Sequence, residues 1–300
     1  MNILLLSEIN PMLSNGGGFT IMQDVVKHAI ERGHEVIVKT PTDDQNAVKQ
    51  NITNSDLTIS WDIFNEPNKR PRTWFPPETL THLVNDGNYV AASCGYSDVC
   101  PVDYLPCSGT AKLFCPECFK NNGLVRQYWK RAKAAVYLSP LQAKISLDIL
   151  GIDREPYIMV PTVDHKEFYP MGLERIWDYA YVGWICEAKG YLTICKYIED
   201  NNLQDKKIAW VGGSLVGKMK YGEHIGKLDR SELPVFLNQV DNFFALTRWP
   251  EPYGLSIKEA QLCNCNIISN GNSGWASCED AGLNCSNGYG KFLGFLEEIN

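Results

Sequence analysis

Residues 3–38 read ILLLSEINPMLSNGGGFTIMQDVVKHAIERGHEVIV, and this stretch decides the fold class. The apolar run at 3–6 predicts a buried strand, and the three glycines at 16–18 predict a tight turn. Apolar side chains recur at helical spacing through 19–32, and residues 35–38 predict a second buried strand. A strand, a glycine turn, a helix and a strand in this order form a βαβ unit, which indicates a parallel sheet.

The same alternation of strand and helix signals runs along the whole chain, with one restart after Pro170. Ser139 and Pro140 are typical of a helix start, and the helix should run on to Gly151. Further strands are expected at 57–60, 89–92, 135–138, 179–182, 207–211, 242–246 and 266–269, and helices at 124–133, 190–200, 256–263 and 291–299, with one more helix opening at 229–233. We therefore expect an α/β protein of two Rossmann-like domains with parallel sheets, residues 1–169 and residues 170–300.

The bulk composition excludes several classes of protein. The chain has 300 residues, of which 44% are hydrophobic, which is enough for two folded domains. A net charge of −7 argues against a large nucleic-acid footprint, although it leaves a local basic groove open. No apolar run approaches the ~20 residues that span a bilayer, and the N-terminus lacks the basic region and cleavage site of a signal peptide. A cytoplasmic protein without a membrane span is expected.

Three motifs between residues 139 and 260 carry the functional signal. The first is EPYGLSIKEA at 251–260, which contains two glutamates with seven residues between them. The others are SPLQA at 139–143 with VPTVD at 160–164 and FYP at 168–170, and YVG at 181–183 with Lys189 and Gly190. In this order they resemble the retaining GT-B glycosyltransferases of the group 1, family 4 type. The resemblance implies two Rossmann-like domains that face each other across a cleft, a nucleotide-sugar donor, and transfer with retention of configuration.

The resemblance places the donor site in the C-terminal domain. Glu259 would accept hydrogen bonds from the ribose hydroxyls, and Glu251 would bind hydroxyls of the transferred sugar. Between them, Tyr253, Gly254 and Leu255 form a turn at a helix N-terminus. Backbone N–H groups and the helix dipole favour phosphate oxygens at such a turn. The expected donor is a UDP-, GDP- or ADP-sugar, and the family usually works without a catalytic metal.

The loops around the donor would supply a cation and close backbone approach. Lys189 would face the departing diphosphate, whose negative charge grows as the glycosidic bond breaks. The resemblance also places Gly183, six residues before Lys189, among the donor-binding residues. Gly16, Gly17 and Gly18 would let the backbone of the first domain approach the donor.

One position departs from the pattern of the family. The family usually has an arginine directly after the strand glycine, and this sequence has Trp184 there. Arg248 or Lys218 would then supply the missing cation, and Arg248 is preferred because it ends a predicted strand. We expect a catalytic set of Glu251, Lys189 and Arg248. The chain is also compact, with little room for the family's last helix that crosses back to the first domain.

A cysteine-rich stretch at 94–118 interrupts the N-terminal domain. Cys100, Cys107, Cys115 and Cys118 could ligate one ion tetrahedrally, since the last two lie in a tight loop that presents both thiolates. A structural zinc ion would hold a long loop that has little core of its own. Free thiols or disulfides are an alternative, and an iron–sulfur cluster is a further one. The other seven cysteines are expected to pack as small apolar residues.

The N-terminal domain should choose the acceptor, and its sequence leaves several classes open. Three cations and two aromatics lie within 65–75, and 126–133 adds four cations with Tyr128 and Trp129. Such interleaving suits flipped-out or single-stranded nucleic acid, so a viral-type transferase for a modified DNA base is one alternative. A solvated loop and helix face is the simpler interpretation, with a glycan, a lipid-linked sugar or a small molecule as acceptor. A catalytically weak nucleotide-sugar binding module and a sugar epimerase on the same fold are further alternatives.

Overall fold

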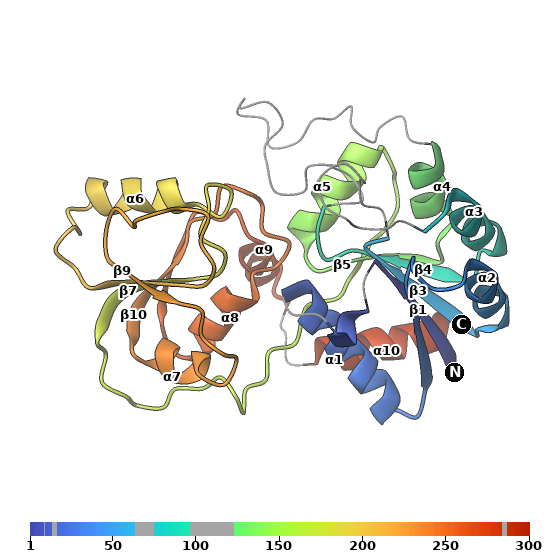
Figure 1. Ribbon diagram of the computed structural model, residues 1–300, viewed down its shortest axis with the longest axis horizontal. Helices are drawn as coiled ribbons and strands as arrows, with labels where there is room; N and C mark the ends of the chain where they lie inside the picture. The colour runs from blue at the N-terminus through green and yellow to red at the C-terminus, as the bar shows by residue number, and fades with distance from the viewer. Residues whose placement is uncertain (9, 14–16, 64–74, 97–122, 284–286) are drawn as a thin grey trace. The chain divides into compact units, whose positions relative to one another are not determined.

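The computed structural model describes residues 1–8, 10–13, 17–63, 75–96, 123–283 and 287–300, which form two compact units (Figure 1). The first unit holds the described residues up to Pro161 together with Asn287–Asn300, and the second begins at Thr162. The second unit thus begins eight residues before the expected start at residue 170. The last helix belongs to the first unit, whereas the sequence had placed it in the second domain.

The first unit is built on six parallel strands in the order β2-β1-β3-β4-β5-β6. They are β1 (Asn2–Ser7), β2 (Glu35–Lys39), β3 (Leu57–Trp61), β4 (Tyr89–Ala92), β5 (Ala134–Tyr137) and β6 (Tyr157–Ile158). The predicted βαβ unit is confirmed, since β1 pairs with β2 in parallel and α1 (Gly17–Glu31) connects them. Strands β3, β4 and β5 are buried along their whole length, as expected for a parallel sheet covered on both faces.

Short-range chemistry sets the limits of the helices in the first unit. Besides α1 and the last helix, the described part of this unit has α2 (Gln45–Asn54), α3 (Pro77–Asp86), α4 (Gly123–Arg131) and α5 (Pro140–Leu150). Helix α5 begins and ends as predicted, because Ser139 Oγ accepts the backbone N–H of Gln142 at 3.2 Å and Gly151 adopts the left-handed conformation at the other end. The sequence prediction missed α2 and α3.

The second unit has five parallel strands in the order β11-β10-β7-β8-β9. They are β7 (Trp177–Val182), β8 (Ile208–Val211), β9 (Glu223–Gly226), β10 (Val240–Ala245) and β11 (Asn266–Ser269), and the helices are α6 (Tyr191–Asp200), α7 (Leu233–Asn238), α8 (Leu255–Leu262) and α9 (Gly274–Asp280). Strands β7 and β10 are therefore neighbours in space, although they are far apart in the sequence. Helix α7 begins at Leu233 and not at 229, because residues 229–232 form a turn in which the Glu232 carboxylate accepts the backbone N–H of Asp229 at 2.7 Å.

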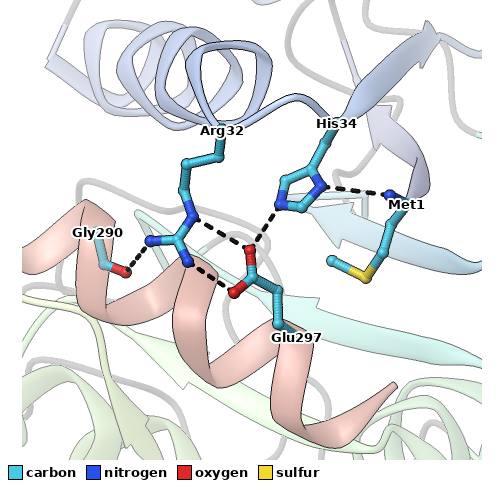
Figure 2. Close-up of polar contacts among 5 residues, drawn as sticks. All are labelled: Met1, Arg32, His34, Gly290 and Glu297. Carbon is cyan, nitrogen blue, oxygen red and sulfur yellow. Dashed lines mark hydrogen bonds and ion pairs between the residues drawn. The ribbon is translucent and has the colours of Figure 1, made fainter.

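Helix α10 (Gly288–Ile299) packs beside α1 in the first unit (Figure 1). Its buried face carries apolar side chains at helical spacing: Tyr289, Phe292, Leu293 and Leu296. Figure 2 shows its polar face, where Glu297 accepts hydrogen bonds from Arg32 Nε at 3.1 Å and Nη2 at 2.6 Å and contacts His34 Nε2 at 2.9 Å. The expectation that the chain had little room for a helix returning to the first unit is wrong, because twelve residues are enough to build one.

Candidate functional site

Two loops meet at the carboxyl ends of the neighbouring strands β7 and β10. Loop 183–190 leads from β7 into α6, and loop 246–254 leads from β10 into α8. Gly190 has a φ of +91°, and a Cβ atom there would collide with the carbonyl oxygen of Leu246, so the close approach of the loops requires glycine. Two backbone N–H groups of the second loop donate to the carbonyl of Ala188 at 3.2 and 2.8 Å. The carboxyl edge of a parallel sheet is where α/β proteins bind ligands.

These loops bring together Lys189 and Glu251, two of the predicted catalytic residues. The Lys189 ammonium forms an ion pair with Glu251 Oε2 and lies 4.1 Å from the centroid of the Trp249 ring. The two side chains are 15% and 23% exposed, so water screens their charges only in part. Burial, and then the charge of Glu251, raises the pKa of Tyr181 well above its ordinary value. Tyr181 is therefore a neutral phenol, and its hydroxyl donates to the Trp184 carbonyl at 3.2 Å.

Beyond Glu251 the chain turns sharply into α8. Gly254 is the N-cap residue, with a φ of +96° that other residues adopt only at a cost. The Tyr253 side chain is buried, and its carbonyl accepts the backbone N–H of Trp275 at 2.7 Å, so a role for Tyr253 would fall to its backbone. The first N–H groups of a helix, here from Leu255 on, have no acceptor within the helix and form the positive end of its dipole. This end of α8 suits an anion.

Glu259 lies on the second turn of α8, and its side chain is only 3% exposed. Its Oε1 atom accepts a hydrogen bond from Arg230 Nη1, and Arg230 Nε lies 3.2 Å from Glu167 Oε1. Burial raises the pKa of Glu259, and the positive charge of Arg230 opposes this rise. The sequence prediction missed Arg230, because no motif contains it and its position was assigned to a helix. The result is a buried carboxylate matched by an arginine from a distant turn.

Neither Arg248 nor Lys218, the two cations predicted to compensate for Trp184, is free of a partner and buried beside Lys189. Arg248 forms an ion pair with Glu187, so it would have to leave that partner to contact a phosphate. Trp184 is 46% exposed, and its ring lies against Gly213. Lys218 is exposed in the segment between β8 and β9. Of the three predicted catalytic residues, the structure pairs two with each other and gives Arg248 a different partner.

In the first unit, polar groups gather at the carboxyl ends of β3 and β4, beside the start of α1. The Asp62 carboxylate accepts hydrogen bonds from Ser93 Oγ at 2.8 Å and from the thiol and backbone N–H of Cys94 at 2.6 and 3.1 Å. The Cys94 sulfur lies against Gly18, where any side chain would collide with it. Cys94 is thus hydrogen-bonded to a carboxylate and is not the simple packing residue that we expected. The sequence prediction missed Asp62, although this residue directly follows a buried strand. Its φ of +48°, unusual for a residue with a side chain, is visible only in the structure.

Comparison with solved structures decides the architecture. HepE of Anabaena, in complex with UDP and glucose, gives a TM-score of 0.58 at 14% identity, with 90% of this chain and 80% of that chain covered. AviGT4, a glycosyltransferase involved in avilamycin A biosynthesis, gives 0.56 at 12% identity, with 100% and 91% covered. The chain has the GT-B fold. A third GT-B structure, an alpha-glucosyltransferase in complex with UDP-glucose and DNA containing an abasic site, gives 0.55 at 11% identity, with 99% and 88% covered. No protein-family model and no curated protein matches the sequence.

Several predicted site residues lie outside the part of the GT-B chain that the structure describes. They are Gly16 and the four predicted zinc ligands Cys100, Cys107, Cys115 and Cys118. Gly17 and Gly18 are described and form the first turn of α1. Among the described residues, no group of three or more His, Cys, Asp or Glu side chains could hold a metal ion.

The burial of its rings contradicts the alternative that α4 presents an aromatic and basic surface. Val125, Tyr128 and Trp129 are fully buried, with the Tyr128 hydroxyl donating to the Ser60 carbonyl at 3.1 Å. The rings of α4 therefore belong to the core of the first GT-B domain and cannot stack on nucleic-acid bases. Most of the other predicted region, 65–75, lies outside the described residues, and Phe75 at its end is buried. No helix in the described ranges is both long and apolar enough to cross a bilayer.

Proposed function

We propose that this protein is a glycosyltransferase that moves a sugar from a nucleotide-sugar donor to an acceptor hydroxyl with retention of configuration. The observation that carries the proposal is the Lys189–Glu251 ion pair beside the N-terminus of α8, on the GT-B fold. HepE, which shares this fold, was solved with UDP and glucose and also with UDP-glucose. We therefore rank a UDP-sugar first among the UDP-, GDP- and ADP-sugars.

Each residue of the site has a chemical task in this proposal. Lys189 neutralises the diphosphate as the glycosidic bond breaks, and the first N–H groups of α8 bind its oxygens. Glu251 must then release Lys189 in part and accept hydrogen bonds from hydroxyls of the transferred sugar. Glu259 accepts the ribose hydroxyls, and Arg248 moves from Glu187 to the phosphates. The diphosphate itself would serve as the base, so the reaction needs no protein nucleophile and no catalytic metal.

The acceptor is proposed to be a hydroxyl of a glycan, a lipid-linked sugar or a small molecule. A modified base in DNA is the second candidate, and the solved alpha-glucosyltransferase in complex with DNA favours it. Two observations argue against this candidate. The net charge is −7, and the burial of Tyr128 and Trp129 removes one of the two surfaces that could have stacked on bases. A binding module that no longer turns over is the third candidate.

A thermal-shift screen of the purified protein against UDP, GDP, ADP and CMP and their common sugars tests the donor. A nucleotide present at a hundred times its dissociation constant stabilises the fold by about 2.7 kcal/mol, which raises Tm visibly. Release of nucleoside diphosphate from the same sugar then separates an enzyme from a binding module. If no nucleotide shifts Tm, the proposal is wrong.

The proposed zinc site at Cys100, Cys107, Cys115 and Cys118 has its own test. Elemental analysis should find close to one zinc per chain, and Cys115→Ser should lower both the zinc content and Tm. A metal-free preparation with an unchanged Tm would contradict the site.

A further inference from the structure

Arg230 is the centre of a cluster of which the donor chemistry above uses only Glu259. It lies in the turn between β9 and α7, and its guanidinium carbon is 4.5 Å from the centroid of the Phe168 ring. Its Nε and Nη2 atoms lie 3.2 and 3.3 Å from the two oxygens of Glu167, and its Nη1 donates to Glu259. The ring and the two carboxylates together fix both the plane and the rotation of the guanidinium.

Only one oxygen of the Glu259 carboxylate is used by this cluster. Oε1 accepts from Arg230, and within the described ranges no hydrogen bond reaches Oε2. The Glu259 side chain is 3% exposed, so the second oxygen has little water to replace a protein donor. A buried carboxylate with an unused acceptor lowers the stability of the folded state, because no hydrogen bond replaces the hydration that this oxygen has lost. A carboxylate oxygen in this position suits a ligand that brings hydroxyl donors.

We infer that Arg230 is a positioning residue for nucleoside recognition: it binds Oε1 of Glu259 and leaves Oε2 to accept a ribose hydroxyl. The inference rests on the proposed function, because it assumes that Glu259 meets the ribose. It adds a residue outside the family motif to the donor site. It also assigns the two oxygens of Glu259 to different partners, one to the protein and one to the nucleoside.

The charges around Glu259 give the inference a pH signature. The groups that act on it are Arg230, which favours the anion, and Glu167, which opposes it; the Cys263 thiol lies near enough to feel the charge of Glu259. Burial already raises the pKa of Glu259. Without Arg230 this pKa rises further, and a protonated carboxyl is a poorer acceptor. Loss of Arg230 should therefore weaken ribose recognition most at low pH, with recovery as pH rises.

The test is calorimetry of UDP and 2′,3′-dideoxy-UDP with the full chain and its Arg230→Gln and Arg230→Lys variants, at pH 6 to 9. The wild-type protein should bind UDP roughly tenfold more tightly than the dideoxy analogue, since a hydrogen bond to a charged group is lost. In Arg230→Gln the two affinities should agree within about twofold near pH 6, with the preference partly restored toward pH 9. Arg230→Lys keeps a cation and should retain part of the preference. Arg32→Gln, the same change in an exposed arginine–glutamate pair, should keep the wild-type ratio.

Each adverse result has a distinct meaning. A wild-type ratio in Arg230→Gln overturns the inference and leaves the proposed function standing. Equal losses of UDP and dideoxy-UDP binding at every pH, together with a lowered Tm in both variants, make Arg230 a structural residue and also overturn it. A wild-type protein that binds no UDP removes a uridine donor and this inference together.

Discussion

Two arginine–glutamate pairs, one in each unit, place the same groups in opposite surroundings. In the first unit, Arg32 and Glu297 are 40% and 36% exposed, and water screens both charges. In the second unit, Arg230 is 47% exposed and Glu259 only 3% exposed. An exposed pair contributes little to stability, whereas a buried carboxylate has lost its hydration and depends on its partner. A small contribution to stability is therefore enough to explain the exposed pair. The buried pair is better explained by a role in ligand binding.

The Glu251 carboxylate, which is 23% exposed, lies between Glu297 and Glu259 in burial, and loss of its partner Lys189 should have the largest effect. Lys189→Ala should lower turnover roughly 100- to 1,000-fold, because it removes a preorganised cation from the developing diphosphate charge. The Tm should be affected less than turnover, since the Glu251 carboxylate keeps some contact with water when its partner is lost. The measurement is release of nucleoside diphosphate from the donor found in the thermal-shift screen.

Lys196→Ala is the matched control for this change. Lys196 pairs with Asp200 on the exposed surface of α6, with 73% of its side chain accessible, so turnover should stay at the wild-type level. If Lys189→Ala lowers Tm as strongly as it lowers turnover, Lys189 is a structural residue.

Replacing the buried carboxylate should have the next largest effect. Glu259→Gln keeps the shape of the side chain and removes its charge, so UDP affinity should fall roughly tenfold, measured by calorimetry. The fold should persist, because Arg230 is half exposed and keeps Glu167 as a partner. Unchanged UDP affinity would show that Glu259 does not meet the ribose.

The same substitution in the exposed pair should have the smallest effect. Glu297→Gln should lower Tm by about 2 °C or less at pH 7 and leave UDP affinity unchanged. The hydrogen bond from Arg32 lowers the pKa of Glu297, so the carboxylate stabilises the fold above its ordinary pKa. This stabilisation is lost as pH falls through the lowered pKa, and the wild type and the variant should then unfold at the same temperature. A gap in Tm that widens toward acid pH would contradict this assignment.

Local signals in the sequence predicted a large part of the fold. The opening βαβ unit and the limits of α5 followed from side chains within a few positions of each other, such as Ser139 and Gly151. The buried face of α4 could also have been found this way, because Tyr128 and Trp129 follow Val125 by three and four residues. A nucleic-acid surface there was only an alternative interpretation of the sequence, and the burial of Tyr128 and Trp129 contradicts that alternative.

The parts that the sequence did not predict depend on contacts between distant segments. Arg230 meets Glu167 and Glu259 only because an irregular turn brings them together. Asp62 and Cys94 lie on different strand ends, which meet because β3 and β4 are neighbours. The motif resemblance assigned Lys189 and Glu251 to one donor site, because it carried long-range information that propensities lack, but it did not predict the ion pair between them.

The return of α10 to the first unit has a consequence for synthesis of the chain. Residues 162–283 are, in topological terms, an insertion in a unit whose helix α10 is translated after them. The second unit can leave the ribosome with all of its strands and helices, while the first still exposes the surface of α1 that α10 will cover. The half of the protein that is made first is therefore the half that should finish folding last.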